Sequence, residues 1–137
     1  MTGRGSASIR VLIVDDMVQV RESLRTVLAL AAGIEIVGEA GNGQEAVSLA
    51  EALRPQVVVM DLEMPVTGGY EAARRIKALY PACRMVALTI HGGEAERQRA
   101  LAAGIDVFIV KGAPLAVLLK AIGAATAVGG APAGDSA

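Results

Sequence analysis

The chain has 137 residues, which is enough to bury the core of one domain and too few for two. Thirteen basic and fourteen acidic residues give a formal net charge of −1 at pH 7, so the sequence lacks the basic surface of a nucleic-acid or anionic-membrane binder. Its single cysteine excludes an internal disulfide and a multi-cysteine metal site. Neither a signal peptide nor an apolar run of membrane-spanning length is recognisable, and we therefore expect a soluble cytoplasmic protein with no membrane contact.

Five short runs rich in Val, Ile, Leu and Met recur along the chain. They are residues 11–14, 35–39, 57–60, 85–88 and 107–110. Four of them are apolar throughout, which is typical of strands buried on both faces of a parallel sheet. Apolar residues at helical spacing lie between them: Val20, Leu24, Val27, Leu28 and Ala31; Gly69, Ala72, Ala73, Ile76 and Leu79; Leu115, Leu118, Leu119 and Ile122. This alternation predicts an α/β protein, a (βα)5 three-layer sandwich with a five-stranded parallel sheet.

The same pattern divides the chain into three parts. Residues 1–8 precede the first run and form a short N-terminal extension. Residues 9–126 hold all the periodic segments, so we expect them to form the single domain. Residues 127–137 consist largely of Gly, Ala, Ser and Pro without periodicity, which predicts a flexible C-terminal tail or the stub of a linker.

Polar residues follow four of the predicted strands. Asp15 and Asp16 come after the first run, Asp61 after the third, Thr89 after the fourth and Lys111 after the fifth. Each of them taken alone has a structural explanation, such as a solvated turn, a helix cap or a surface lysine. Ligands of open α/β sheets bind outside the carboxyl ends of the strands, and all five residues would meet there. Their conjunction therefore favours a functional site.

The residue types at this edge indicate a particular chemistry. Three carboxylates within a few ångströms repel one another unless a cation or protonation relieves them. Oxygen ligands of this kind suit Mg²⁺, which retains several water ligands and binds phosphates. A metal beside a carboxylate, a hydroxyl and a lysine is a set of groups for phosphoryl transfer. We predict that Asp61 is the group that attacks phosphorus.

Four motifs resemble one family. VLIVDDM, VVVMDLEMPVTGG, VALTI and AAGIDVFIVKGA together are similar to the response-regulator receiver (CheY-like) domains of two-component signalling, from Arg10 to about Ile122. The stretch LTIHGGEAERQRALAAGIDVFIVKGAPLAVLLKAI further resembles the NarL/FixJ-type receivers, which usually carry a helix-turn-helix domain downstream. The resemblance implies the flavodoxin-like strand order 2-1-3-4-5.

The resemblance also implies how phosphate and metal are bound. Asp61 would accept a phosphoryl group from the phosphohistidine of a sensor histidine kinase or phosphotransfer protein. Asp16 would bind Mg²⁺ directly and Asp15 largely through water, and Asp61 and the backbone carbonyl of Glu63 would complete the protein ligands. Such a domain is not a conventional enzyme, because it catalyses only its own phosphotransfer and autodephosphorylation.

The family further implies a conformational switch. Lys111 would pair with the acyl phosphate, and the Thr89 hydroxyl would bond one of its oxygens. Phe108 matches the aromatic switch position, whose ring fills the space that Thr89 vacates; an ordinary half-buried strand residue is the alternative. The face formed by the fourth helix, fifth strand and fifth helix would thereby repack and control a downstream protein or output domain, or promote a homodimer.

Three positions depart from the family pattern or vary within it. Gly112 follows Lys111 where the family often has proline or aspartate, so the geometry of that peptide is open. Glu63 and His91 lie two residues past Asp61 and Thr89, where the family positions flank the path of the hydrolytic water. We hypothesise that Glu63 and His91 modulate hydrolysis and set the lifetime of the phosphorylated state; exposed side chains without such an effect are the alternative.

Two other functions stay open at this point. A pseudo-receiver would be an interaction module that phosphate does not regulate, and the intact acidic and basic residues argue against it. A Mg²⁺-dependent phosphohydrolase of the haloacid-dehalogenase-like family would have an aspartate where Glu63 stands, and a cap domain for which there is little room. The sequence has no helix-turn-helix, so we expect no direct binding of nucleic acid by this chain. It is either a stand-alone receiver or the N-terminal part of a protein of transcription regulation.

Overall fold

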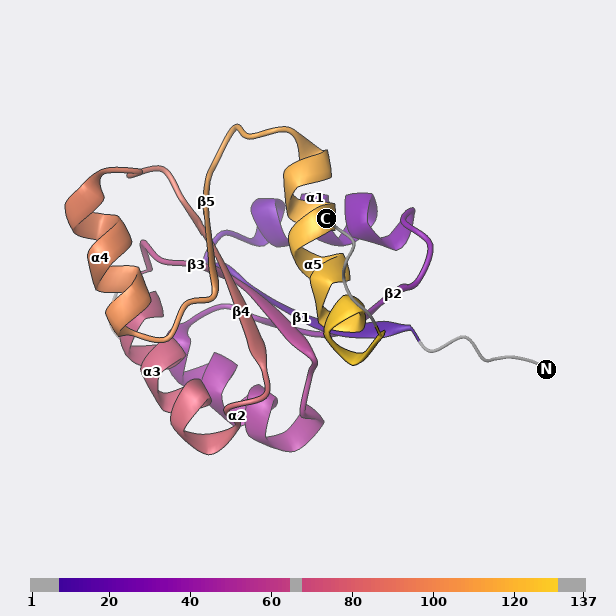
Figure 1. The fold of residues 1–137 in the computed structure, drawn as a ribbon, viewed down its shortest axis with the longest axis horizontal. Coiled ribbons are helices and arrows are strands. Elements are labelled where there is room, and N and C mark those ends of the chain that lie inside the picture. The colour runs from indigo at the N-terminus through magenta and orange to yellow at the C-terminus, as the bar shows by residue number, and fades with distance from the viewer. Residues whose placement is uncertain (1–7, 65–67, 131–137) are drawn as a thin grey trace.

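The computed structural model describes residues 8–64 and 68–130 as one doubly wound domain. The strands are β1 (Ile9–Val14), β2 (Ile34–Ala40), β3 (Val57–Asp61), β4 (Arg84–Thr89) and β5 (Val107–Val110). The helices are α1 (Val18–Ala29), α2 (Gly43–Leu53), α3 (Gly69–Leu79), α4 (Glu94–Ala102) and α5 (Leu115–Gly130). All strand neighbours are parallel, in the order β2-β1-β3-β4-β5 (Figure 1). The predicted α/β class, (βα)5 topology and strand order are therefore confirmed.

Helices cover both faces of the sheet, and the central strand β3 is buried at every position (Figure 1). Val57 and Val59 pack in a core cluster with residues of α1 and α5. Val58 and Met60 point to the opposite face and pack with residues of α2, α3 and α4. Because each fully buried valine contributes about 1.5–3 kcal/mol, the uninterrupted apolar run of β3 stabilises both layers at once.

The elements begin and end close to where the sequence places them, but two predicted apolar-face residues are exposed and one helix is longer than predicted. Leu115, the first residue of α5, is 45% exposed. Leu79, predicted on the apolar face of α3, is 51% exposed, because it lies at the end of the helix, past the last buried contact at Ile76. α5 continues to Gly130, so residues 127–130 of the predicted tail are helical and the helix extends past the predicted end of the domain at residue 126. Residues 1–7 and 131–137, which include most of the predicted extension and tail, lie outside the described residues.

Two glycines shape the edge of the sheet where the strands end. A Cβ on Gly69 would lie 2.6 Å from the Asp61 carbonyl oxygen and 2.8 Å from Leu62 Cα, so only glycine lets α3 begin this close to the end of β3. Gly112 has φ +99°, a conformation that side chains disfavour, and it turns the chain directly after Lys111. The glycine after Lys111 is therefore explained by this turn. None of the helices in the described part of the chain has the length and apolar character needed to cross a membrane.

Candidate functional site

The strand order brings three aspartates together at the carboxyl edge of the sheet. Asp15 and Asp16 follow β1, and Asp61 ends the neighbouring strand β3. One carboxylate oxygen of each lies within 4.8 Å of the other two. Asp15 and Asp61 are buried, whereas Asp16 is exposed. This acidic cluster of Asp15, Asp16 and Asp61 confirms the predicted convergence, and its exposed member gives it access to solvent.

Asp15 carries an unsatisfied buried oxygen. Its Oδ1 accepts a hydrogen bond from the N–H of Met17 at 2.9 Å. Its Oδ2 has no hydrogen-bond partner among the described residues, and the Lys111 ammonium lies 3.9 Å away. Burial raises the pKa of the Asp15 carboxyl, although the Met17 N–H opposes this shift. A buried carboxylate oxygen without a partner fits a bound cation.

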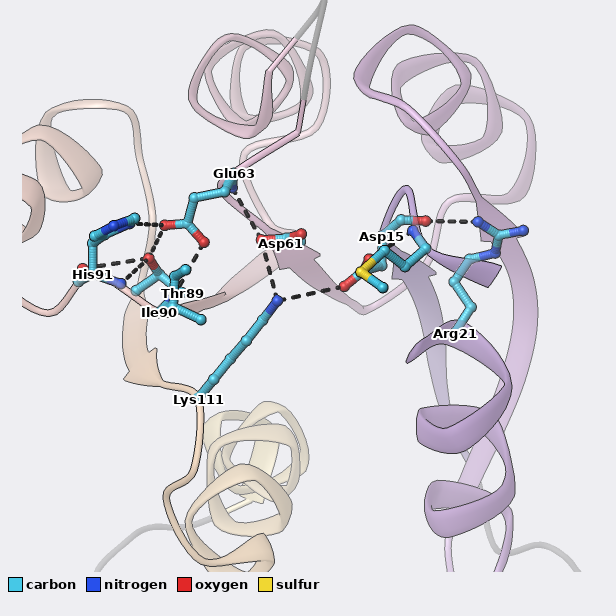
Figure 2. Close-up of polar contacts among 9 residues, drawn as sticks. Asp15, Arg21, Asp61, Glu63, Thr89, Ile90, His91 and Lys111 are labelled. Carbon is cyan, nitrogen blue, oxygen red and sulfur yellow. Dashed lines mark hydrogen bonds and ion pairs between the residues drawn. The ribbon is translucent and has the colours of Figure 1, made fainter. Parts of the chain in front are cut away.

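Lys111 reaches from the end of β5 to both buried aspartates, as Figure 2 shows. Its Nζ is 3.6 Å from Asp61 Oδ1, which also accepts a hydrogen bond from the N–H of Glu63 at 3.0 Å. Burial raises the pKa of the Asp61 carboxyl, and the charge of Asp15 adds to this effect while Lys111 opposes it. The single ammonium group of Lys111 thus faces two carboxylates that repel each other. Because one positive charge cannot compensate two negative charges, net negative charge remains at this edge.

The end of β4 supplies two hydrogen-bond donors beside Asp61. Thr89 is fully buried, and its hydroxyl donates to Oε2 of Glu63. The N–H of the next residue, Ile90, donates to Oε1 of the same carboxylate at 3.2 Å. His91 Nδ1 lies 3.3 Å from Glu63 Oε2 (Figure 2). We call the Thr89 hydroxyl and the Ile90 N–H the β4 donors.

Glu63 is the anion that these donors hold. Burial would raise the pKa of its carboxyl, but the hydrogen bonds from Thr89 and the Ile90 N–H outweigh burial and lower the pKa. The carboxyl is therefore ionised at neutral pH. The structure thus joins Glu63 and His91, which the sequence singled out separately, into one polar group next to Asp61.

Phe108 lies on the same side of the sheet as Thr89. It is half-buried, pairs with Ala87 in the neighbouring strand and packs against the core cluster beneath α4. Thr89 is two residues past Ala87, so its side chain shares this face. The guanidinium carbon of Arg97 in α4 lies 5.9 Å from the centre of the Phe108 ring. A switch role for Phe108 stays a prediction; its ring lies beside Arg97 of α4 and on the same face of the sheet as Thr89.

Two groups at this edge were not predicted from the sequence. Arg21 in α1 donates from Nη1 to the backbone oxygen of Asp15 at 2.7 Å, and its Nε contacts Glu39 at 3.4 Å. The available signal in the sequence was the position of Arg21 five residues after Asp16, in the first turn of α1. The N–H of Ile90 has no sequence signal, because every non-proline residue carries one.

Comparison with known proteins identifies the family. Residues 11–123 match the response regulator receiver domain family. The chain is 40% identical over 114 residues to the response regulator GacA of Pseudomonas viridiflava, covering 83% of this chain and 53% of that protein. It is 39% identical over 104 residues to the response regulator protein VraR of Staphylococcus aureus, covering 76% of this chain and 50% of VraR. The chain thus spans about half the length of the curated relatives it matches.

Solved structures agree with this match. A LuxR-family two-component response regulator from Aurantimonas sp. SI85-9A1 superposes with a TM-score of 0.82 at 36% identity, covering 86% of this chain and 84% of that chain. The response regulator domain of Thermotoga maritima CheB gives a TM-score of 0.80 at 32% identity, covering 91% and 99%. The chain therefore belongs to the response regulator receiver domain family, whose members are phosphorylation-activated signalling switches. These findings do not favour the pseudo-receiver alternative.

The residues present also fit the metal of the family. Receiver domains bind Mg²⁺ at an acidic pocket, and the acidic cluster offers three carboxylates with only oxygen donors. The unpartnered Oδ2 of Asp15 is a vacant acceptor inside this cluster. A divalent cation there would neutralise the charge that Lys111 leaves uncompensated.

Proposed function

We propose that Asp61 accepts a phosphoryl group from the phosphohistidine of a sensor histidine kinase or phosphotransfer protein in a Mg²⁺-dependent reaction. The observation that carries this proposal is the Lys111 ammonium between two buried aspartates, with the β4 donors beside the second. No other group in the described residues combines a buried carboxylate, a cation and two donors in this way. Asp61 would thus be the residue of this receiver domain that carries the phosphoryl group.

The geometry suggests how the transfer proceeds. Asp61 Oδ1 is held by the Glu63 N–H and faces Lys111, so Oδ2 is the oxygen left to attack phosphorus. As the new oxygen–phosphorus bond forms, the nitrogen–phosphorus bond of the donor breaks and the imidazole leaves. Lys111 offsets the negative charge on Asp61 and on the phosphoryl oxygens.

Mg²⁺ would be held by the acidic cluster together with the backbone carbonyl of Glu63. When bound, it supplies positive charge for the phosphoryl oxygens and orients them for in-line displacement. As the family resemblance implies, exposed Asp16 would bind the metal directly and Asp15 largely through water.

The output of the switch is proposed to lie on the α4–β5–α5 face. Thr89 and Phe108 share one side of the sheet, and Arg97 connects the Phe108 ring to α4. Movement of the Thr89 hydroxyl onto a phosphoryl oxygen would change the packing of Phe108 and hence of this face. The partner is a downstream protein, an output domain or, after phosphorylation, a second copy of the chain.

Glu63 and His91 are further proposed to set the lifetime of the phosphorylated state. His91 Nδ1 lies 3.3 Å from Glu63 Oε2, and Glu63 also contacts the N–H of Ile90 just past β4. The matching family positions flank the path of the hydrolytic water. Replacing each with alanine is expected to change the rate of dephosphorylation of the purified phosphoprotein. Rates equal to that of wild type in both variants would refute the role.

Intact mass after incubation with acetyl phosphate tests the main proposal. Wild type is expected to gain one phosphoryl group when Mg²⁺ is present and none when the metal is chelated. Asp61→Asn removes the nucleophile and should gain none under either condition. Glu71→Gln is the matched control, because Glu71 is an exposed carboxylate on α3 whose ion-pair partners among the described residues are Arg74 and Arg75. An adduct that persists in Asp61→Asn would overturn the proposal.

A further inference from the structure

We propose that Glu63 is an internal anion that occupies the β4 donors before phosphorylation, so that a phosphoryl group on Asp61 must displace its carboxylate. The inference rests on the proposed function, because it takes Asp61 as the phosphoacceptor. It assigns Glu63 a role in the phosphorylation equilibrium itself, separate from the effect on hydrolysis proposed above.

The contacts of Glu63 use both of its carboxylate oxygens. Oε1 accepts the N–H of Ile90 at 3.2 Å, and Oε2 accepts the Thr89 hydroxyl and lies 3.3 Å from Nδ1 of His91. The Glu63 side chain is 30% exposed, and its partner Thr89 is fully buried, whereas Ile90 and His91 lie at the surface. Figure 2 shows the carboxylate directed at the end of β4 and the Glu63 backbone directed at Asp61.

Glu63 therefore contacts both the proposed phosphoacceptor, through its main chain, and the β4 donors, through its side chain. Its N–H holds Oδ1 of the nucleophile at 3.0 Å, and its carboxylate holds the donors on the neighbouring strand. Asp61 pairs with Leu88 in the sheet register, directly before Thr89, so the β4 donors follow the position that neighbours Asp61. A carboxylate and a phosphoryl group both offer anionic oxygens and compete for the same two donors.

Displacement has a cost that sets the affinity for the phosphoryl group. Hydrogen bonds to a charged acceptor are stronger than neutral ones, and the carboxylate must surrender two of them. The ionised Glu63 would also repel the negative phosphoryl oxygens if it stayed in place. Removing the carboxylate should therefore favour the phosphorylated state, whereas removal of an ordinary supporting residue would weaken it.

Binding of beryllium trifluoride, a stable mimic of the phosphoryl group, measures this competition without hydrolysis. With Mg²⁺ present, Glu63→Ala is expected to bind the mimic at least about tenfold more tightly than wild type, the effect of freeing one charged hydrogen bond. Glu63→Gln keeps an acceptor but no charge and should fall between the two. Glu71→Gln should match wild type, because the exposed Glu71 carboxylate forms ion pairs with Arg74 and Arg75 of its own helix.

A double-mutant cycle separates occupation of the donors from simple charge repulsion. Thr89→Val removes one β4 donor, so the gain from Glu63→Ala should shrink in this background if the carboxylate competes for that donor. The Ile90 amide resonance gives a second readout. Its proton should lose hydrogen-bonded character in free Glu63→Ala and regain it when the mimic binds.

The outcomes distinguish this inference from the proposed function. Unchanged or weaker binding by Glu63→Ala, with wild type binding normally, overturns the inference and leaves Asp61 as phosphoacceptor. An equal gain with and without Thr89 also overturns it, because repulsion alone would then explain the effect. If no variant binds the mimic and wild type gains no phosphoryl group, the proposed function and the inference fail together.

Discussion

The amino and carboxyl edges of the parallel sheet treat their charged residues in opposite ways. At the amino edge, Asp106 precedes β5, pairs with Lys77 at 2.8 Å and accepts the N–H of Met85 at 2.7 Å. At the carboxyl edge, Asp15 and Asp61 are more deeply buried and share one lysine at 3.9 and 3.6 Å. The Asp106 carboxylate is paired with Lys77 and with the N–H of Met85. The carboxylates of Asp15 and Asp61 together carry more negative charge than Lys111 compensates.

The difference shows how to separate structural from functional carboxylates in one fold. A carboxylate with a full set of partners holds elements together, and its contribution is present without any ligand. Buried carboxylates that repel each other destabilise the folded protein until a cation or another charged ligand arrives. The carboxyl edge therefore has the properties of a binding site whose charge is compensated only when its ligands are bound. Four predictions test this difference between the two edges of the sheet.

The largest effect is expected from Lys111→Ala. In the proposed mechanism Lys111, whose Nζ lies 3.6 Å from Asp61 Oδ1, offsets the negative charge of the phosphoryl oxygens, and loss of such a group lowers a transfer rate by about 100-fold or more. The rate of phosphorylation by acetyl phosphate, followed by intact mass, measures this loss. Lys120→Ala, which removes an exposed lysine of α5, is the control and should leave the rate unchanged. A wild-type rate in Lys111→Ala would contradict the role.

Mg²⁺ should stabilise the protein against unfolding through the carboxyl edge alone. At a concentration 100 times its Kd, a ligand that binds only the folded state adds about 2.7 kcal/mol to the free energy of unfolding. Thermal unfolding with and without Mg²⁺ should show a higher Tm in wild type and little change in Asp16→Asn. Equal stabilisation of both proteins would place the metal elsewhere.

At the amino edge the expected result is reversed. Asp106→Ala leaves the Met85 N–H and Lys77 without their acceptor and should lower the free energy of unfolding by about 1–3 kcal/mol. Asp106→Asn keeps an acceptor and should lose less. Urea unfolding measures the difference. At urea concentrations where Asp106→Ala is still folded, its phosphorylation should proceed as in wild type. Loss of phosphorylation in the folded variant would contradict the difference between the two edges.

The smallest effect concerns Cys83, which is buried beside β4 at the amino edge. Burial raises the pKa of its thiol to about 12, whereas an unfolded cysteine ionises near pH 8.5. Between these values the unfolded chain releases a proton that the folded protein keeps, so stability is lost as pH rises, by about 1.4 kcal/mol per pH unit. Raising the pH from 8 to 10 should therefore lower the free energy of unfolding of wild type relative to that of Cys83→Ala. A constant difference would contradict a buried neutral thiol.

The sequence predicted the fold because the apolar runs are uninterrupted and the helical spacings are regular. It also predicted the acidic cluster, since residues directly after parallel strands must meet at one edge. The contacts of Glu63 with Thr89 and Ile90 could not be predicted in the same way. They depend on a side-chain conformation and a backbone donor that only the packed loops define. The helical spacing places Gly69 among the apolar residues of a helix, whereas the structure shows that its lack of a side chain lets the helix approach Asp61 and Leu62.

Locating the phosphoryl group tests the central claim most directly. Wild type phosphorylated with acetyl phosphate and Mg²⁺ can be reduced with borohydride, which converts a phosphorylated aspartate to homoserine, and the change can be mapped by peptide mass spectrometry. We predict that the conversion occurs at position 61, requires Mg²⁺ and is absent from Asp15, Asp16 and Asp106. Conversion at another carboxylate, or a stable phosphoryl group on a different residue type, would contradict the assignment of Asp61 as the phosphoacceptor.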